Sequence, residues 1–108
     1  GRSEPSAPVA ERVAQARQIQ AERFASLGLE GVSTNAACPT ALVEEIAAPN
    51  AAGMSLLLEA SEKPGFSARA YHRVLKVART LADLAGSDKV ARPHIAEALS
   101  YRLSFGAA

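Results

Sequence analysis

The chain has 108 residues, which suits one domain with a single core and is too short for two independent domains. Hydrophobic residues make up 48% and charged residues 21%, values that indicate a globular protein and exclude a disordered chain. The formal net charge of +1 gives no overall electrostatic case for nucleic acid or a membrane as partner. With two Tyr, three Phe and no Trp, the core must depend on Leu, Val, Ile and Ala, which favours an all-α fold.

The N-terminal part predicts a linker followed by a long helix. Residues 1–8 carry several Ser and Pro residues and are interpreted as a linker. From Val9 to Leu27, apolar residues recur at helical spacing, so we expect a helix of roughly 18 residues that ends at Gly28. Its apolar stripe is narrow and weak at Gln20, so this helix should pack along a partner surface and not enter a core.

The central part predicts a loop and two short helices. Residues 28–39 show no periodicity and are expected to form the loop. Thr40 is predicted to cap a helix that runs to about Ala47, and Asn50 to cap a second helix that ends before Pro64. The residues expected to face the core are Leu42, Val43 and Ile46, then Met54, Leu57, Leu58 and Ser61. We expect the two helices to form a hairpin.

The strongest amphipathic pattern lies between Ser67, a predicted N-cap, and Gly86, a predicted C-terminal stop. On a helical wheel, the core side carries Tyr71, Val74, Leu75, Ala78, Leu81, Ala82 and Ala85. The outward side is basic and carries Arg69, Arg73 and Lys76, with His72 and Arg79 on its flank. By periodicity alone, these cations form a solvated face.

A last helix is predicted after a turn at residues 87–89. Pro93 fits its first position, and its core side carries Ile95, Ala98 and Leu99. We expect the end of the chain to fray from Phe105 onward. The predicted organisation is a bundle of about five helices over residues 9–105, between the linker at 1–8 and a tail at 106–108.

Few residues carry chemistry that would support catalysis or metal binding. His72 and His94 lack further ligands at helical spacing, so we predict no metal site. Cys38 has no basic neighbour in sequence to activate it and is expected to be a half-buried hydrophobic residue. No phosphate-binding loop of the G-x-x-x-x-G-K-[ST] kind occurs, so we expect no catalytic residue and no ATP hydrolysis in isolation.

The lone cysteine and the apolar runs also bear on location. A single cysteine excludes an intrachain disulfide and favours a cytoplasmic location. No apolar run approaches the roughly 20 residues that span a bilayer, so we expect no membrane partner. The chain opens at Gly1 without an initiator methionine, which we interpret as a segment of a longer protein.

The segment from Gly65 to Gly86 resembles the C-terminal domain of magnesium-chelatase-like AAA+ proteins, the ComM-type competence helicases. In that family, a Ser-x-Arg-Ala-Tyr-x-Arg-x-Leu-x-Val-Ala-Arg-Thr-x-Ala-Asp-Leu segment opens the helix that carries the sensor 2 arginine. Residues 12–20 and 94–102 are also similar to the family pattern, so the resemblance runs from about Glu11 to Arg102. Its weakest part is residues 28–64, where Pro-Asn-Ala-Ala-Gly replaces a more acidic helix start.

The resemblance implies that the chain is the lid of an AAA+ ATPase and that Arg69 takes the sensor 2 role. Arg69 would contact the terminal phosphate of ATP, which the parent protein would bind with Mg²⁺. Arg73 and Lys76 would assist at the phosphate or line a subunit interface. The implied partners are the P-loop AAA+ module of the same chain, neighbouring subunits of a homo-hexamer, and branched DNA.

Two classes of function stay open from the sequence. In the first, the chain is the regulatory lid of a ring ATPase, either a competence-type DNA branch-migration helicase or a true chelatase that inserts magnesium into protoporphyrin. In the second, it is a stand-alone helical module whose basic helix binds DNA or an acidic protein. The resemblance favours the competence-type lid.

Overall fold

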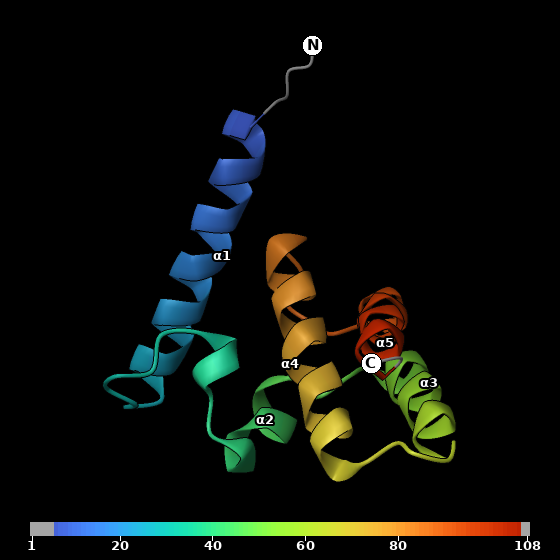
Figure 1. Cartoon of the computed structure of the whole chain (residues 1–108). Helices are drawn as coiled ribbons and strands as arrows, with labels where there is room; N and C mark the ends of the chain where they lie inside the picture. The colour runs from blue at the N-terminus through green and yellow to red at the C-terminus, as the bar shows by residue number, and fades with distance from the viewer. Residues whose placement is uncertain (1–5, 107–108) are drawn as a thin grey trace.

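A computed structural model describes residues 6–106 of the chain, with side chains for residues 8–101. This part forms five α-helices and one short 3-10 helix (Figure 1). In chain order they are α1 (Ser6–Ser26), η1 (Asn35–Ala37), α2 (Thr40–Ile46), α3 (Ala51–Ser61), α4 (Ala68–Leu84) and α5 (Arg92–Gly106). The predicted all-α bundle with a long N-terminal helix is confirmed.

Helix α4 is the centre of the bundle. It packs against α1, η1 and α2 on one side and against α5 on the other, and α3 packs against α5 (Figure 1). The predicted hairpin of α2 and α3 is therefore wrong. The reason is a backbone contact between the α2–α3 loop and the α4–α5 loop. Pro49 pairs with Val90, and the Asn50 amide donates to the Val90 carbonyl at 2.8 Å, so α3 is held next to α5.

The core is built mainly from small and medium aliphatic side chains contributed by every helix. Its fully buried apolar members include Phe24, Val43, Leu57, Val74, Leu75, Ala78, Ala82, Val90, Ile95 and Ala98. Leu58, which we expected to face this core, is 50% exposed. Because α3 packs mainly against α5, it buries a stripe that is too narrow to include Leu58. Ala85, also expected on the core side, is exposed because α4 ends at Leu84.

Helix α1 starts earlier and buries more than its sequence predicts. It begins at Ser6, and Pro8 fits within its first turn because the amides there need no partner in the helix. The part of the predicted linker at residues 1–5 lies outside the described residues. Residues 8–15 are exposed, whereas Ala16, Gln20 and Phe24 are buried and the helix packs on α4. The C-terminal half of α1 thus belongs to the core, and its N-terminal half projects from the bundle (Figure 1).

Most of the predicted helix ends are confirmed. Ser67 Oγ accepts from the Ala70 amide at 3.1 Å, and Asn50 Oδ1 accepts from the Gly53 amide at 2.9 Å. Gly86 has a φ of 72°, the left-handed conformation that ends α4. Thr40 is instead the first residue of α2, because the extended backbone of Pro39 already occupies the N-cap position.

The last helix reaches further than expected. Pro93 is its second residue, and His94 Nδ1 accepts from the Ala91 amide at 2.9 Å, so a side chain in the first turn satisfies the amide that precedes the helix. Phe105, the predicted start of fraying, lies inside α5, while residues 107–108 of the predicted tail fall outside the described residues. None of the helices between residues 6 and 106 is long and apolar enough to cross a lipid bilayer.

Candidate functional site

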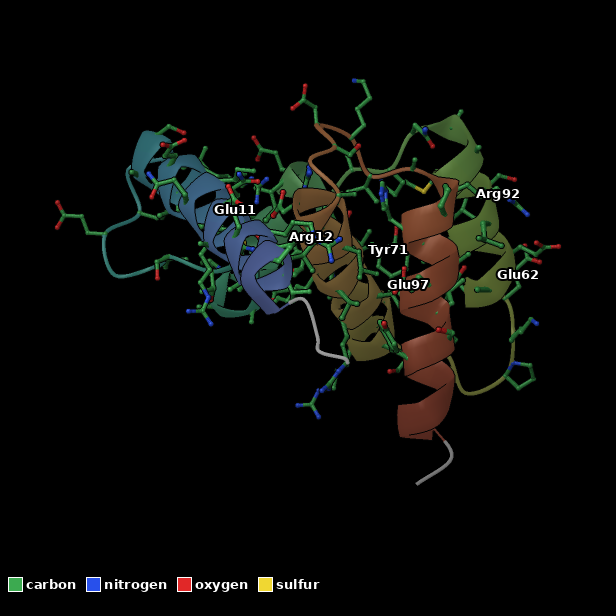
Figure 2. All side chains as sticks on the ribbon, turned by 90° about the horizontal axis from the view of Figure 1, so that it is seen from above. Glu11, Arg12, Glu62, Tyr71, Arg92 and Glu97 are labelled. Atoms are coloured by element: carbon green, nitrogen blue, oxygen red, sulfur yellow. The ribbon has the colours of Figure 1, made fainter. Side chains whose placement is uncertain are left out.

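The predicted site residue Arg69 lies in the first turn of α4. Ser67 caps this turn, which places Arg69 at an exposed position away from the core. Tyr71, labelled in Figure 2, stands two residues further along α4 and therefore lies on the opposite side of the helix. Tyr71 packs partly buried against the core. The division between a basic outward side and an apolar inward side is therefore confirmed for this turn.

Arg69, Arg73 and Lys76 line one groove of about 570 Å³ between α4 and the η1–α2 segment. The groove's remaining lining residues are Ala36, Thr40, His72 and Val77. None of these lining residues is acidic, and the cationic ones stand on successive turns of one helix. The structure thus brings together all three residues that the sequence singled out.

Two of the groove residues also connect its walls. Lys76 Nζ donates to the Ala36 carbonyl of η1 at 3.0 Å, so its ammonium group ties α4 to the opposite wall. His72 Nε2 lies 3.1 Å from Glu44 Oε2 on α2. These contacts hold the η1–α2 segment at a defined distance from the basic side of α4.

Arg79 does not belong to the basic face. Its side chain is 6% exposed and donates to the Ser87 carbonyl at 2.8 Å and to the Asp88 carbonyl at 3.1 Å. It also forms an ion pair of 3.1 Å with Asp83. Burial lowers the pKa of Arg79, and the negative charge of Asp83 opposes this shift. The interpretation that all the basic residues of this helix form a solvated face is therefore wrong for Arg79.

A buried polar cluster, which the sequence did not reveal, joins α1, η1 and α4. Arg23 donates to both carboxylate oxygens of Asp83, at 3.0 and 2.7 Å, and to Asn35 Oδ1 at 2.9 Å. Asn35 Nδ2 donates to Asp83 Oδ2 at 2.9 Å and to Thr80 Oγ1 at 3.0 Å. Gln20 Oε1 accepts from the Asn35 amide at 2.8 Å, which explains why the apolar stripe of α1 is interrupted there.

The sequence predicts one contact of this cluster and not the others. Arg79 and Asp83 stand four residues apart, a spacing that predicts an ion pair on a helix. Arg23 and Asn35 come from distant positions, and only the packing of α1 and η1 on α4 brings them to Asp83. The cluster is a structural joint that fixes the direction of α1.

Cys38 is more buried than expected. Its exposed fraction is 3%, and burial raises the pKa of its thiol although the positive charges of Lys76 and Arg23 oppose the shift. The fold thus brings basic residues near Cys38 that its sequence neighbours do not supply. Burial still has the larger effect on the pKa of the thiol. A thiol held in its neutral form is a poor nucleophile.

The histidines have partners within the chain. His72 contacts Glu44 and His94 accepts from the Ala91 amide. Among the described side chains, no three His, Cys, Asp or Glu residues stand close enough to share a metal ion. The guanidinium groups exposed along α4 are of a kind that suits phosphate or carboxylate oxygens.

The chain matches one known protein family over most of its length. Residues 3–102 match the family described as the C-terminal domain of magnesium chelatase subunit ChlI. The match includes α1 through most of α5, and hence the groove and the buried polar cluster.

Several bacterial proteins contain a similar segment. Competence protein ComM of Haemophilus influenzae is 43% identical over 101 residues, which cover 94% of this chain and 18% of that protein. An uncharacterized protein of Mycobacterium tuberculosis is 36% identical over 99 residues, 92% of this chain and 19% of that protein. The uncharacterized protein YifB of Escherichia coli is 58% identical over 38 residues, 35% of this chain and 8% of that protein.

These relatives are much longer than the chain, which spans 18% of the ComM protein and 19% of the mycobacterial one.

Proposed function

Because the chain belongs to the family of magnesium chelatase ChlI C-terminal domains, we propose that it is the lid of a ComM-like AAA+ ATPase in which Arg69 senses the bound nucleotide. The observation that carries this proposal is the position of Arg69, exposed in the first turn of α4 and lining a groove with Arg73 and Lys76. Arg69 is thus available to a ligand on another part of the protein.

The proposed mechanism is electrostatic. ATP and Mg²⁺ would be held by a P-loop module elsewhere in the parent protein, and Arg69 would reach the terminal phosphate across the interface. A guanidinium group offers a planar fork of donors that matches phosphate oxygens. The lid would then move as a rigid body when the phosphate is lost, because the contact that holds it is lost. The chain supplies the sensing group and no residue for the chemical step.

Helix α1 is the proposed contact with the ATPase module or a neighbouring subunit. Its projecting half exposes Val9 by 47% and Val13 by 36%, apolar surface that a partner would cover. Through Arg23 and Asp83 this helix is joined directly to α4. A displacement of the lid would therefore be transmitted to α1.

We propose that the parent is a homo-hexameric, cytoplasmic helicase that acts on branched DNA in competence or recombination. The similarity to a protein named for competence supports this assignment. The family description supports a second candidate, the lid of a true magnesium chelatase subunit. The two candidates share the same lid and nucleotide sensor and differ in the substrate of the parent.

The experiment that tests this function is ATP hydrolysis by the full-length parent, with and without branched DNA. We expect Arg69→Ala to lower turnover by roughly tenfold or more, because a preorganised positive charge at the phosphate is lost. Arg92→Ala, a change at an exposed arginine on α5, is the matched control and should leave turnover unchanged. Stimulation by branched DNA would favour the helicase over the chelatase.

Unchanged hydrolysis in Arg69→Ala, with the lid folded, would contradict the sensor role. Arg69 would then be an ordinary surface residue, and the lid would couple to nucleotide through other contacts.

A further inference from the structure

Helix α1 contains the same five-residue pattern twice. The first repeat, residues 10–14, is Ala-Glu-Arg-Val-Ala, and the second repeat, residues 21–25, is Ala-Glu-Arg-Phe-Ala. They are offset by eleven residues. This offset is about three helical turns, so corresponding residues lie within about 20° of one another around the axis and about 16 Å apart along it. The two repeats therefore present similar chemistry on one face of α1.

The second repeat is docked in the bundle. Phe24 is fully buried, and Arg23 donates to both carboxylate oxygens of Asp83 on α4, at 2.7 and 3.0 Å. Gln20, one turn before Phe24, is also buried and accepts from the Asn35 amide. The structure thus shows what this pattern binds: a helix that places a carboxylate opposite the arginine while the phenylalanine enters an apolar core.

The first repeat lies on the half of α1 that projects beyond the bundle (Figure 1). Arg12 is exposed, and among the described residues its guanidinium group has no hydrogen bond or ion pair. Val13, in the place of Phe24, is 36% exposed, and Val9, in the place of Gln20, is 47% exposed. Because Val9 replaces a glutamine, the uncovered stripe is more apolar than the buried one.

The charges around this stripe indicate the kind of partner. At 100° per residue, Val9 and Val13 lie at the centre of the stripe, with Arg12 and Arg17 on its two borders. Glu11, labelled beside Arg12 in Figure 2, lies on the far side of the helix. A helix with carboxylates beside its apolar residues is therefore complementary to the stripe. A second copy of α1 is not, because its arginines would face these arginines.

We propose that the first repeat is a docking site for an acidic amphipathic helix that precedes this segment in the same polypeptide of the parent protein. The inference rests on the proposed function, in which the chain is the lid of a longer ATPase, and it names the chemistry of the segment that α1 contacts. The family is described as C-terminal and the relatives are much longer, so the rest of such a parent is connected at the projecting end of α1. This connection raises the effective concentration of a helix in that part.

The expected contact follows the observed one. A carboxylate of the partner helix accepts from Arg12, as Asp83 accepts from Arg23. Val9 and Val13 pack against the apolar residues of the partner, which needs no deep pocket because valine is smaller than phenylalanine. The α4 helix of a second copy cannot serve as this partner, since its Asp83 already pairs with its own Arg23. Helix α1 then joins α4 and the partner helix along one face.

Photo-cross-linking in the full-length parent tests this proposal. Ala10 corresponds to Ala21, which is half-buried in the docked repeat, so Ala10 lies at the edge of the expected contact. With p-benzoylphenylalanine in place of Ala10, we expect one main cross-link, to a helical segment before this chain that carries Asp or Glu within a turn of apolar residues. The same substitution at Gln15, exposed on the other side of α1, should give no such product.

Charge reversal then tests the ion pair. Arg12→Glu places a like charge opposite the partner's carboxylate and should lower the cross-link yield by about fivefold or more. Glu11→Lys reverses the neighbouring charge on the far side and should leave the yield within about twofold. Changing the carboxylate of the cross-linked segment to Lys, together with Arg12→Glu, should restore the yield. Both residues are exposed on the projecting half, so neither α1 variant should change the melting temperature of the chain.

Three results would overturn the proposal. A cross-link to residues of a second copy of this chain would make the surface a site of self-association. A cross-link to a neighbouring subunit, detected by mixing isotope-labelled and unlabelled parent, would contradict a partner in the same polypeptide. Equal yields in Arg12→Glu and Glu11→Lys would show that no carboxylate faces Arg12.

Failure of this inference is distinguishable from failure of the proposed function. If the cross-link at Ala10 is absent while Arg69→Ala lowers ATP hydrolysis in the parent, the sensor stands and the docking site is wrong. If the cross-link and its charge dependence are as expected while Arg69→Ala leaves hydrolysis unchanged, the docking site stands and the sensor role is wrong.

Discussion

Asp83 holds two arginines from different parts of the chain. Its carboxylate is 1% exposed and pairs with Arg23 of α1 and with Arg79 of α4. Asp83→Ala leaves Arg79 buried without a counter-charge, and we expect the free energy of unfolding to fall by about 3–5 kcal/mol. Denaturant unfolding followed by circular dichroism measures this loss.

Asp88→Ala is the control for this prediction. Asp88 is exposed, and it accepts from Arg79 through its backbone carbonyl, which the substitution keeps. Asp88→Ala should change the free energy of unfolding by no more than about 0.5 kcal/mol. Similar losses in both variants would show that the charge of Asp83 is not what stabilises the joint.

Because the thiol of Cys38 is buried, we expect the free energy of unfolding to depend on pH in the alkaline range. Burial raises the pKa of Cys38 in the folded chain, while in the unfolded chain the thiol ionises near about pH 8.5. Above that pH, the unfolded chain has lost a proton that the folded chain keeps, so the free energy of unfolding should fall with rising pH until the folded pKa is passed. Unfolding measured from about pH 7 to pH 10 tests this slope.

Cys38→Ala separates this effect from that of the tyrosines. Burial, followed by the charge of Glu44, also raises the pKa of Tyr71, and Tyr71 is still present in the variant. We therefore expect the slope between about pH 8.5 and 9.5 to be smaller in Cys38→Ala. The same slope in both proteins would mean that Cys38 ionises alike in the folded and unfolded chain.

At the scale of elements, Gly53 sets how closely α3 approaches the start of α5. A Cβ there would lie 3.1 Å from Pro49 Cβ, 3.2 Å from the Ala91 carbonyl carbon and 3.3 Å from the Arg92 nitrogen. Two of these neighbours are backbone atoms, one at the end of the α4–α5 connection and one in the first residue of α5, so α3 would have to shift. We expect Gly53→Ala to lower the melting temperature, although alanine is the better helix former by about 1 kcal/mol.

Ser55→Ala, an exposed change within the same helix, provides the comparison and should leave the melting temperature unchanged or slightly raised. A higher melting temperature in Gly53→Ala would show that the connection yields and that helix propensity dominates.

At the scale of the whole molecule, α1 divides into a projecting half and a buried half. Residues 8–15 are exposed, whereas Phe24 is fully buried. A chain that begins at Ala14 should therefore unfold with a free energy within about 1 kcal/mol of the full chain. Phe24→Ala should lose about 3–5 kcal/mol. Thermal and denaturant unfolding of the three proteins checks both expectations.

A large loss of stability in the shortened chain would mean that the projecting half is part of the bundle. The same shortened lid, placed in the parent protein, should impair ATP hydrolysis if α1 contacts the ATPase module as proposed.

Local chemistry explains what the sequence determined by itself. The class of the fold, the caps at Asn50 and Ser67, the stop at Gly86 and the two sides of α4 depend on residues within a few positions of one another. Arg69, Arg73 and Lys76 share an outward face because their spacing follows the helical period. These features were predictable because short-range hydrogen bonds and periodicity decide them.

Contacts between distant residues were decided only by the tertiary structure. The tie of Asn50 to Val90 sends α3 to α5, and the packing of α1 on α4 brings Arg23 to Asp83. Lys76 donates a hydrogen bond to η1 because the Ala36 carbonyl lies across the groove. Each depends on which helices lie side by side, and helices with apolar stripes of similar width have many partners that bury comparable area. Polar groups buried between them then select one arrangement, because any other would leave them unpaired.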